Sequence, residues 1–155
     1  MNATALATTP GDLGPVEIPS RLFGPIRVSP DAFITFPDGL PGFAGERRFI
    51  LLPAAPEGLF WLQSVDEGRL AFLLVDPFLA FPGYSLDLPD LPGDGVPPLV
   101  LVVATLPRAE SEECTANLQA PVLLDLGQRT GRQLILADGR HSPRHPFDLH
   151  ARLAV

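Results

Sequence analysis

The stretch LFWLQSVDEGRLAFLLVDP, residues 59–77, is the clearest structural signal in this chain of 155 residues. Two apolar, aromatic-containing runs, Phe60–Val65 and Leu70–Val75, flank the turn residues Asp66-Glu67-Gly68. Apolar runs of this length on both sides of a short turn that contains glycine predict a β-hairpin. We therefore expect two antiparallel strands near the middle of the chain.

Further strand-like runs lie on both sides of this hairpin. They are Gly24–Pro30, Asp31–Phe36, Arg47–Pro53, Pro98–Pro107, Ala120–Leu126 and Arg132–Asp138. The run Pro98–Pro107 is continuously apolar, which predicts a strand buried on both faces. The last two runs are expected to pair across the GQRTG stretch, residues 127–131.

These short runs are separated by many of the 19 prolines and 14 glycines, and little of the chain favours long helices. Only residues 108–117, RAESEECTAN, are expected to form one or two helical turns. About eight short strands at regular spacing predict an all-β, mainly antiparallel, small barrel-like domain, with a sandwich as the alternative. Closing the sheet would remove the edges that such apolar strands otherwise expose.

The stretch FPDGLPGF, residues 36–43, combines two turn dipeptides with two large apolar side chains. Leu40-Pro41-Gly42-Phe43 suits a type II turn, because glycine occupies the position that requires a positive φ. Such a turn brings Leu40 and Phe43 close together. Two alternatives remain open: the pair fills the core of the domain, or it contacts a partner.

Residues 1–20 are small and polar with scattered prolines, and we expect a flexible N-terminal tail followed by one domain over residues 21–150. This N-terminus lacks the basic and apolar regions of a signal peptide, and no stretch has the length of a membrane span, so we expect a cytoplasmic protein. The single cysteine excludes a disulfide framework.

The formal net charge of −7 argues against direct binding to nucleic acid, which requires a basic surface. The charge is unevenly distributed, because the segment Glu57–Asp94 holds seven acidic residues and one arginine. One interpretation of this acidic segment is that it binds a basic partner. The alternative is that it is only a solvated surface.

The histidines and the cysteine do not form a recognisable catalytic or metal-binding motif. His141 and His145 are four residues apart, but Pro143 and Pro146 prevent the helix on which that spacing would create a metal site. Cys114 follows two glutamates, whose charges would raise the pKa of its thiol and disfavour a nucleophilic role. We therefore expect no catalytic residues, no metal and no cofactor.

Asn117, in the stretch TANLQAP (residues 115–121), is a polar residue among small and apolar neighbours. Asparagine and threonine side chains often bond to the local backbone and hold a turn, and this is the structural interpretation. The functional interpretation is that Asn117 contacts the backbone of a bound peptide.

Six motifs follow one another in order from residue 23 to residue 147: FGPIRV, FITFPDGLPGF, FWLQSVDEGRLAFLLVDPF, CTANLQAPVLLD, RQLIL and SPRHPF. Their order and spacing resemble the FliW family of flagellar assembly factors. The chain departs from the family pattern at His141, where an aromatic residue is common, in its proline-rich loop Asp76–Pro98, and in its N-terminal extension.

The resemblance implies a small β-barrel without catalysis and two protein partners. One partner is flagellin, bound through its C-terminal helical region, and the other is CsrA, a basic RNA-binding translational regulator. In the family, FliW bound to CsrA prevents repression of flagellin mRNA, and newly made flagellin competes for FliW. This partner exchange couples flagellin translation to its secretion and assembly.

Two groups of side chains are candidates for these interactions. Large apolar residues in turn-rich segments, together with the amide of Asn117, are expected to bind flagellin: Leu40, Phe43, Phe78, Phe81 and Asn117. The acidic loop residues Asp87, Asp90 and Asp94 are expected to bind CsrA. The competing hypotheses are a small β-barrel hydrolase or metal-dependent enzyme, and a barrel that binds a small ligand.

Overall fold

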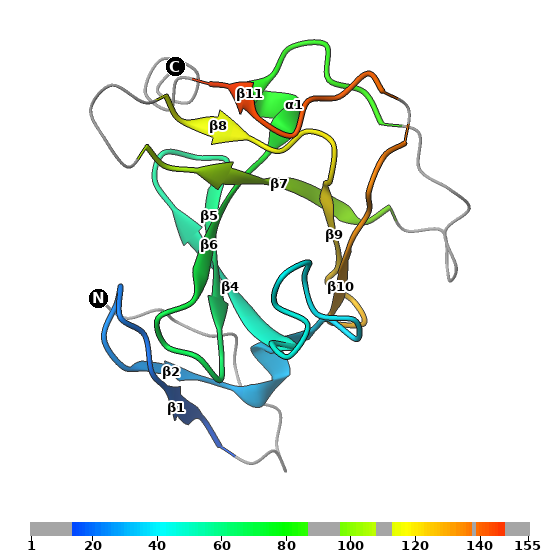
Figure 1. Cartoon of the computed structure of the whole chain (residues 1–155). Coiled ribbons are helices and arrows are strands. Elements are labelled where there is room, and N and C mark those ends of the chain that lie inside the picture. Colours follow the sequence, from blue (N-terminus) through cyan, green and yellow to red (C-terminus); the bar gives the residue numbers. More distant parts are fainter. Residues whose placement is uncertain (1–13, 87–96, 108–112, 138, 148–155) are drawn as a thin grey trace.

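The computed structural model describes residues 14–86, 97–107, 113–137 and 139–147 (Figure 1). Two short helices, η1 (Pro30–Ala32) and α1 (Pro77–Ala80), accompany the strands. The strands are β1 (Val16–Ile18), β2 (Ile26–Val28), β3 (Ile34–Thr35), β4 (Arg48–Ala54), β5 (Leu59–Ser64), β6 (Ala71–Val75), β7 (Leu99–Thr105), β8 (Thr115–Ala116), β9 (Val122–Asp125), β10 (Thr130–Gln133) and β11 (His145–Pro146). No helix in these ranges has the length and hydropathy needed to cross a bilayer.

Seven of these strands close into a barrel, in the order β7-β6-β5-β4-β3-β10-β9, with β9 pairing back onto β7. All pairings are antiparallel except that of β3 with β10, where Thr35 lies opposite Thr130. The strands β8 and β11 extend the sheet from β7 at one end of the molecule (Figure 1). The predicted all-β, mainly antiparallel barrel is confirmed.

The predicted central hairpin is also confirmed, as β5 and β6. Its register places Leu59 opposite Val75 and Gln63 opposite Ala71. The amide of Leu70 donates to the carbonyl of Glu67 at 3.0 Å and closes the turn between the strands. On its other side β5 pairs with β4 over six residues, so the hairpin forms the centre of the sheet.

Alternating side chains of the barrel strands enter different apolar clusters. On β7, Leu101 and Val103 face the cluster inside the barrel, whereas Val102 and Ala104 face a second cluster under α1, β8 and β11. A third cluster lies where β1 and β2 cover the outer side of Ile50 on β4. The prediction that the strand within Pro98–Pro107 is buried on both faces is therefore confirmed.

The predicted boundary between tail and domain at residue 20 is wrong, because the domain begins before it. Strand β1 pairs with β2 over three residues, and Ile18 is buried in the third cluster. The hydroxyl of Ser20 donates to Gln63 Oε1 at 2.8 Å, and the amide of Arg21 donates to the carbonyl of Gly68. Strand β1 has two apolar residues, Val16 and Ile18, and a pattern this short is too weak to predict a strand. Residues 1–13 of the predicted tail lie outside the described ranges.

Several element boundaries also differ from the predictions. The predicted strand Asp31–Phe36 begins as helix η1, because the Ser29 hydroxyl accepts a hydrogen bond from the amide of Asp31 and Pro30 starts the helical turn. The predicted strand Arg132–Asp138 corresponds to β10, which begins two residues earlier and ends at Gln133.

The helical turns predicted for residues 108–117 are not found in the part of that stretch that is described. Residues 113 and 114 form no helix, and Thr115–Ala116 form β8, which pairs with β7. Residues 108–112 lie outside the described ranges. In the described ranges the helical turns are η1 and α1, which lie in segments for which extended chain or loop was predicted.

Candidate binding surface

The segment Phe36–Phe43 forms two consecutive turns. The amide of Gly39 donates to the carbonyl of Phe36 at 2.9 Å, and the amide of Phe43 donates to the carbonyl of Leu40 at 2.7 Å. Gly42 has a φ of 84°, as the predicted type II turn requires. At Gly39 a Cβ atom would lie 2.7 Å from the Cα of Ala44, so only glycine fits there.

The two apolar side chains of this double turn have different surroundings. Leu40 is only 4% exposed and belongs to the cluster inside the barrel, so its predicted role in flagellin binding is not supported by its position. Phe43 is 40% exposed, and its ring packs edge-on against that of Phe72, with the ring centroids 5.4 Å apart. Of the pair, Phe43 is the side chain that a partner can contact.

Helix α1 presents a second exposed apolar surface. Asp76 caps its N-terminus by accepting a hydrogen bond from the amide of Phe78 at 2.9 Å, and Pro77 occupies the first turn. Pro77 and Ala80 are buried, while Phe78 and Leu79 are 51% and 54% exposed. The cap therefore fixes a helical turn that holds two adjacent large apolar side chains in solvent.

Aromatic rings from two segments continue this surface. The Tyr84 ring lies 5.3 Å from that of Phe78 and 5.3 Å from that of His141, both in edge-on geometry. We call Phe78, Leu79, Tyr84 and His141 the α1 surface. These contacts join the segment after β6 to the segment before β11, at the end of the molecule where Figure 1 shows α1 beside β11.

Phe81 does not belong to the exposed part of this surface. It is 7% exposed, and its ring contacts those of His145 and Phe147 at 5.1 and 5.4 Å. The predicted role of Phe81 as a flagellin contact is therefore not supported, because the side chain packs under α1. It anchors the segment that carries Phe78 and Leu79.

Asn117 holds a turn, in agreement with the structural interpretation. Its Oδ1 accepts hydrogen bonds from the amides of Gln119 and Ala120, both at 3.1 Å. The backbone amide of Asn117 donates to the carbonyl of Val103 on β7 at 2.9 Å. Because these contacts use the side-chain oxygen within the chain, a role for that oxygen in binding a peptide backbone is not supported.

The predicted CsrA-binding residues Asp87, Asp90 and Asp94 lie outside the described ranges. Within the acidic segment, Glu57 is exposed and Asp76 caps α1. Two further acids are paired with arginines. Asp66 forms an ion pair with Arg48 in which both carboxylate oxygens take part. Glu67 forms an ion pair with Arg69, with 3.2 Å between Glu67 Oε1 and Arg69 Nε. Part of the charge counted in the sequence is therefore balanced by neighbouring arginines.

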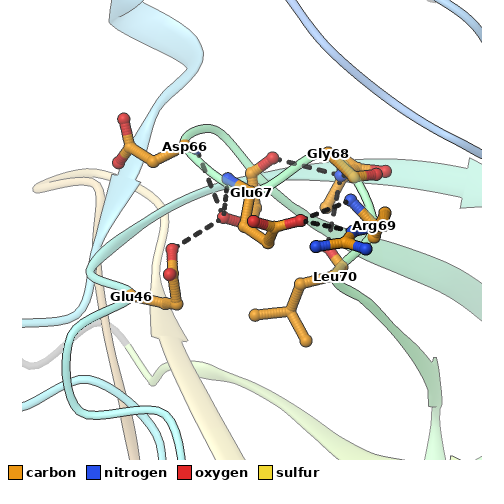
Figure 2. Close-up of polar contacts among 8 residues, drawn as sticks. Glu46, Asp66, Glu67, Gly68, Arg69 and Leu70 are labelled. Carbon is orange, nitrogen blue, oxygen red and sulfur yellow. Dashed lines mark hydrogen bonds and ion pairs between the residues drawn. The ribbon is translucent and has the colours of Figure 1, made fainter.

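The turn of the central hairpin is held by a polar network (Figure 2). The hydroxyl of Ser64 donates to Glu46 Oε2 at 3.1 Å and accepts from the amides of Asp66 and Glu67. The interaction of Arg69 with Glu67 lowers the pKa of that carboxyl group. Glu46 also bonds through its amide to the carbonyl of Phe43 at 3.0 Å, so the network links the hairpin turn to the double turn.

The buried side chain of Gln63 completes this network. Its Oε1 accepts from Ser20, and its Nε2 lies 3.1–3.3 Å from the carbonyl oxygens of Ser64, Gly68 and Leu70. A buried amide needs such partners, because leaving it unpaired costs about 1–3 kcal/mol. The network therefore fixes the hairpin turn and ties the N-terminal hairpin to the barrel.

His141, His145 and Cys114, for which no catalytic or metal-binding role was predicted, lie near aromatic or apolar groups. His141 and His145 lie against the rings of Tyr84 and Phe81, and His150 lies outside the described ranges. Among the described residues, no three His, Cys, Asp or Glu side chains form a group that could hold a metal ion. Burial raises the pKa of the Cys114 thiol, where the sequence suggested neighbouring glutamates as the cause.

Three members of the α1 surface, Leu79, Tyr84 and His141, were not predicted from the sequence to bind a partner. Leu79 and Tyr84 lie in the proline-rich segment that was interpreted as a loop. The dipeptide Asp76-Pro77 was the available signal, because an aspartate cap followed by proline in the first turn marks a helix start. With that helix predicted, Phe78 and Leu79 would have been placed together on one helical turn, although their exposure would still not have been predicted.

Comparisons with known proteins agree with this architecture. A sequence model of the family described as FliW protein matches residues 17–147. The chain is 36% identical over 140 residues to the flagellar assembly factor FliW of Moorella thermoacetica, covering 84% of this chain and 87% of that one. It is 38% identical over 144 residues to that of Desulfitobacterium hafniense, covering 88% and 94%. A crystal structure of the flagellar assembly factor FliW matches with a TM-score of 0.76 and 31% identity, covering 84% of this chain and 96% of that one.

Proposed function

Because this chain belongs to the FliW family of flagellar assembly factors, we propose that it acts as a non-catalytic binding protein for flagellin and for CsrA. It binds the C-terminal region of flagellin in the cytoplasm, and in the absence of free flagellin it binds CsrA. CsrA held in this way does not repress flagellin mRNA. Flagellin synthesis is thereby coupled to flagellin secretion and assembly.

The observation that carries this proposal is similarity over most of the chain to proteins named flagellar assembly factor FliW. The similarity covers both sequence and fold, and the matched range 17–147 begins within β1 and includes every later strand of the structure. A shared fold alone would not support a shared function, because one fold serves many functions. A shared function is supported by the sequence identity of more than 30% over most of the chain.

The α1 surface has the properties that a flagellin-binding site needs. Unpolymerised flagellin presents amphipathic helices with an apolar stripe, and such helices bind to exposed apolar surfaces. Phe78 and Leu79 are adjacent and more than half exposed, and the capped turn and the ring of Tyr84 hold them in place. Exposed aromatic and aliphatic side chains of this kind are typical anchors of protein interfaces. Phe43 offers a second, separate anchor.

Binding of CsrA is supported by charge. CsrA is basic, and the chain carries a net charge of −7. Asp66 and Glu67 are paired with arginines, so the attraction of a basic partner is assigned to other acids of the segment Glu57–Asp94. We propose the exposed Glu57 and, from their place in the sequence, Asp87, Asp90 and Asp94. Complementary charge of this kind acts mainly on the rate of association.

The test is a binding measurement with purified flagellin and purified CsrA. A Phe78→Ser/Leu79→Ser variant removes the two exposed anchors while Pro77, Ala80 and the Asp76 cap remain. We expect flagellin binding to weaken by at least about tenfold, because losing one interface anchor commonly costs more than 1 kcal/mol. The unfolding midpoint should change little, since both side chains are exposed.

Leu22→Ser is the matched control, because Leu22 is 53% exposed and lies in the connection between β1 and β2, strands that Figure 1 shows at the other end of the molecule from α1. This variant should bind flagellin normally. Equal loss of binding in both variants would mean that the α1 surface is not the binding site. Failure of the unmodified protein to bind either partner would refute the proposed function itself.

A further inference from the structure

The chain that follows β10 is extended and hydrogen-bonded along one side only. The amide of Leu134 donates to the carbonyl of Pro121 at 2.9 Å, and the amide of Leu136 donates to that of Gln119 at 2.8 Å. These bonds continue the antiparallel register of β10 with β9 beyond Gln133. In Figure 1 this orange segment runs on from β10 beside the end of β9.

In the described part of the chain, no strand pairs with the opposite edge of this segment beyond Thr130. In an antiparallel pair, alternate residues direct their backbone groups to opposite sides, so those of Gln133 and Ile135 point away from residues 119–122. Strand β3, the neighbour of β10 on that side, pairs only through Thr35 and Thr130. Across the described ranges, no backbone hydrogen bond reaches the amide or carbonyl of Ile135.

The side chain at this edge is also exposed. Ile135 is 65% exposed, the highest value among the large apolar side chains described. Gly131, four residues earlier and on the same side of the strand, faces the ring of Phe36 inside the barrel. Ile135 therefore continues the inner side of the barrel past its rim. The usual protections of an exposed edge, such as proline or lysine, are missing from Leu134–Ala137.

We propose that the edge Gln133–Ala137 binds an extended segment of a partner protein as an added antiparallel strand. The backbone of that segment bonds to Gln133 and Ile135, and an apolar side chain packs on Ile135. Arg132 is exposed and forms no ion pair in the described part of the chain, so it selects a carboxylate beside the apolar residue. This inference is independent of helix binding at the α1 surface.

Charge favours a foreign acidic segment over a second copy of this chain. Residues 129–152 contain five arginines and two aspartates, and Arg132, Arg140 and Arg144 are exposed. Two copies paired along this edge would each contribute a segment of net positive charge to the same interface, which disfavours association. A segment with carboxylates on either side of its apolar residues avoids this repulsion.

The test uses a synthetic peptide with valine and threonine alternating and glutamate at both ends. Amide hydrogen exchange of the whole protein is followed by NMR as the peptide is raised to about 1 mM, a weak-binding range. The backbone amide hydrogens of Gln133 and Ile135 should exchange rapidly in the free protein and slowly when the peptide is bound. Those of Leu134 and Leu136 should be protected throughout. Absence of peptide-induced protection at this concentration would overturn the proposal.

Two N-methylated forms of the peptide test the geometry. One carries N-methyl groups on its odd residues and the other on its even residues, so each has one blocked edge. Because an added strand uses one edge only, one form should bind and the other should not. Equal binding by both forms, or by neither, would show that the peptide does not bind as a strand.

Variants of the protein complete the test. Ile135→Pro removes the outward amide while leaving the hydrogen bonds of Leu134 and Leu136 in place, whereas Ile135→Ala keeps the amide. Peptide binding should be lost in the first and only weakened in the second. Should Ile135→Pro fail to fold, Arg132→Glu provides the test: it should weaken binding of the glutamate peptide and strengthen that of a peptide with terminal lysines. A dimer seen by sedimentation that Ile135→Pro converts to a monomer would overturn the proposal and assign the edge to a second copy.

Discussion

Leu40 and Phe43 bond to each other across one turn, yet one is a core residue and the other a surface residue. Leu40→Ala should cost about 2–5 kcal/mol of unfolding free energy, because it leaves a cavity inside the barrel. Phe43→Ala should cost only about 1–2 kcal/mol, since the ring is partly exposed and loses mainly its contact with Phe72. Urea unfolding of both variants measures the difference, and equal losses would contradict it.

Gly131 is required by the ring of Phe36, which would lie 2.5 Å from a Cβ atom at that position. Gly131→Ala should therefore destabilise the barrel by about 1–3 kcal/mol, the usual range for overpacking. Gly127→Ala is the control, because the nearest atom there, Asp125 Oδ1, lies at an ordinary 3.4 Å. Thermal unfolding should separate the two variants, and equal midpoints would mean that Phe36 moves aside without cost.

At the scale of elements, the N-terminal hairpin is part of the folded domain. A chain that begins at residue 21 lacks β1, the buried Ile18 and the hydrogen bond from Ser20 to Gln63. We expect its melting temperature to fall by about 10 °C, the shift produced by a loss of a few kcal/mol in a domain of this size. A chain that begins at residue 14 keeps β1 and is the control. Similar melting temperatures for both would contradict the structural role of β1.

The elements that the sequence predicted well are those with a strong local pattern. The β5–β6 hairpin and β7 carry enough consecutive apolar residues to be recognised alone. Strands β1, β8 and β11 have two or three residues each and exist because a neighbouring strand offers hydrogen bonds. Such pairings depend on the tertiary structure, so local sequence cannot reveal them.

The candidate site was predictable only in part, for a related reason. The sequence identified Phe43 and Phe78 as exposed candidates but grouped them with Leu40 and Phe81, which are buried. Whether a phenylalanine in a turn faces solvent depends on what packs above it. For Phe81 that neighbour is the distant residue Phe147. Composition and spacing contain no information about such contacts.

At the scale of the whole molecule, the uneven charge predicts different salt dependences for the two partners. Attraction between the acidic segment and CsrA is screened over about 8 Å at physiological ionic strength, so association should slow as salt rises. Reversing Asp87, Asp90 and Asp94 to arginine should slow CsrA association and leave flagellin binding nearly unchanged. Stopped-flow rates at several salt concentrations provide the measurement.

Reversal of Glu110, Glu112 and Glu113 to arginine is the control for this prediction, because it changes the net charge equally at a second acidic cluster. If both variants slow CsrA association to the same extent, the effect comes from net charge and not from the loop. A rate that does not depend on salt would contradict an electrostatic role for either cluster.

The parallel pairing of Thr35 with Thr130, the only one among the strands that the structure describes, has a consequence for the order of folding. The β4–β5–β6 meander requires only short loops, and isolated hairpins form in about 1–10 μs. Pairing β3 with β10 instead closes a loop that includes most of the domain. The conformational entropy of that loop must be lost before the single residue pair between the two strands forms. The meander should therefore form first and the β3–β10 junction last. By the same reasoning, this junction should be among the first places to open in the native protein.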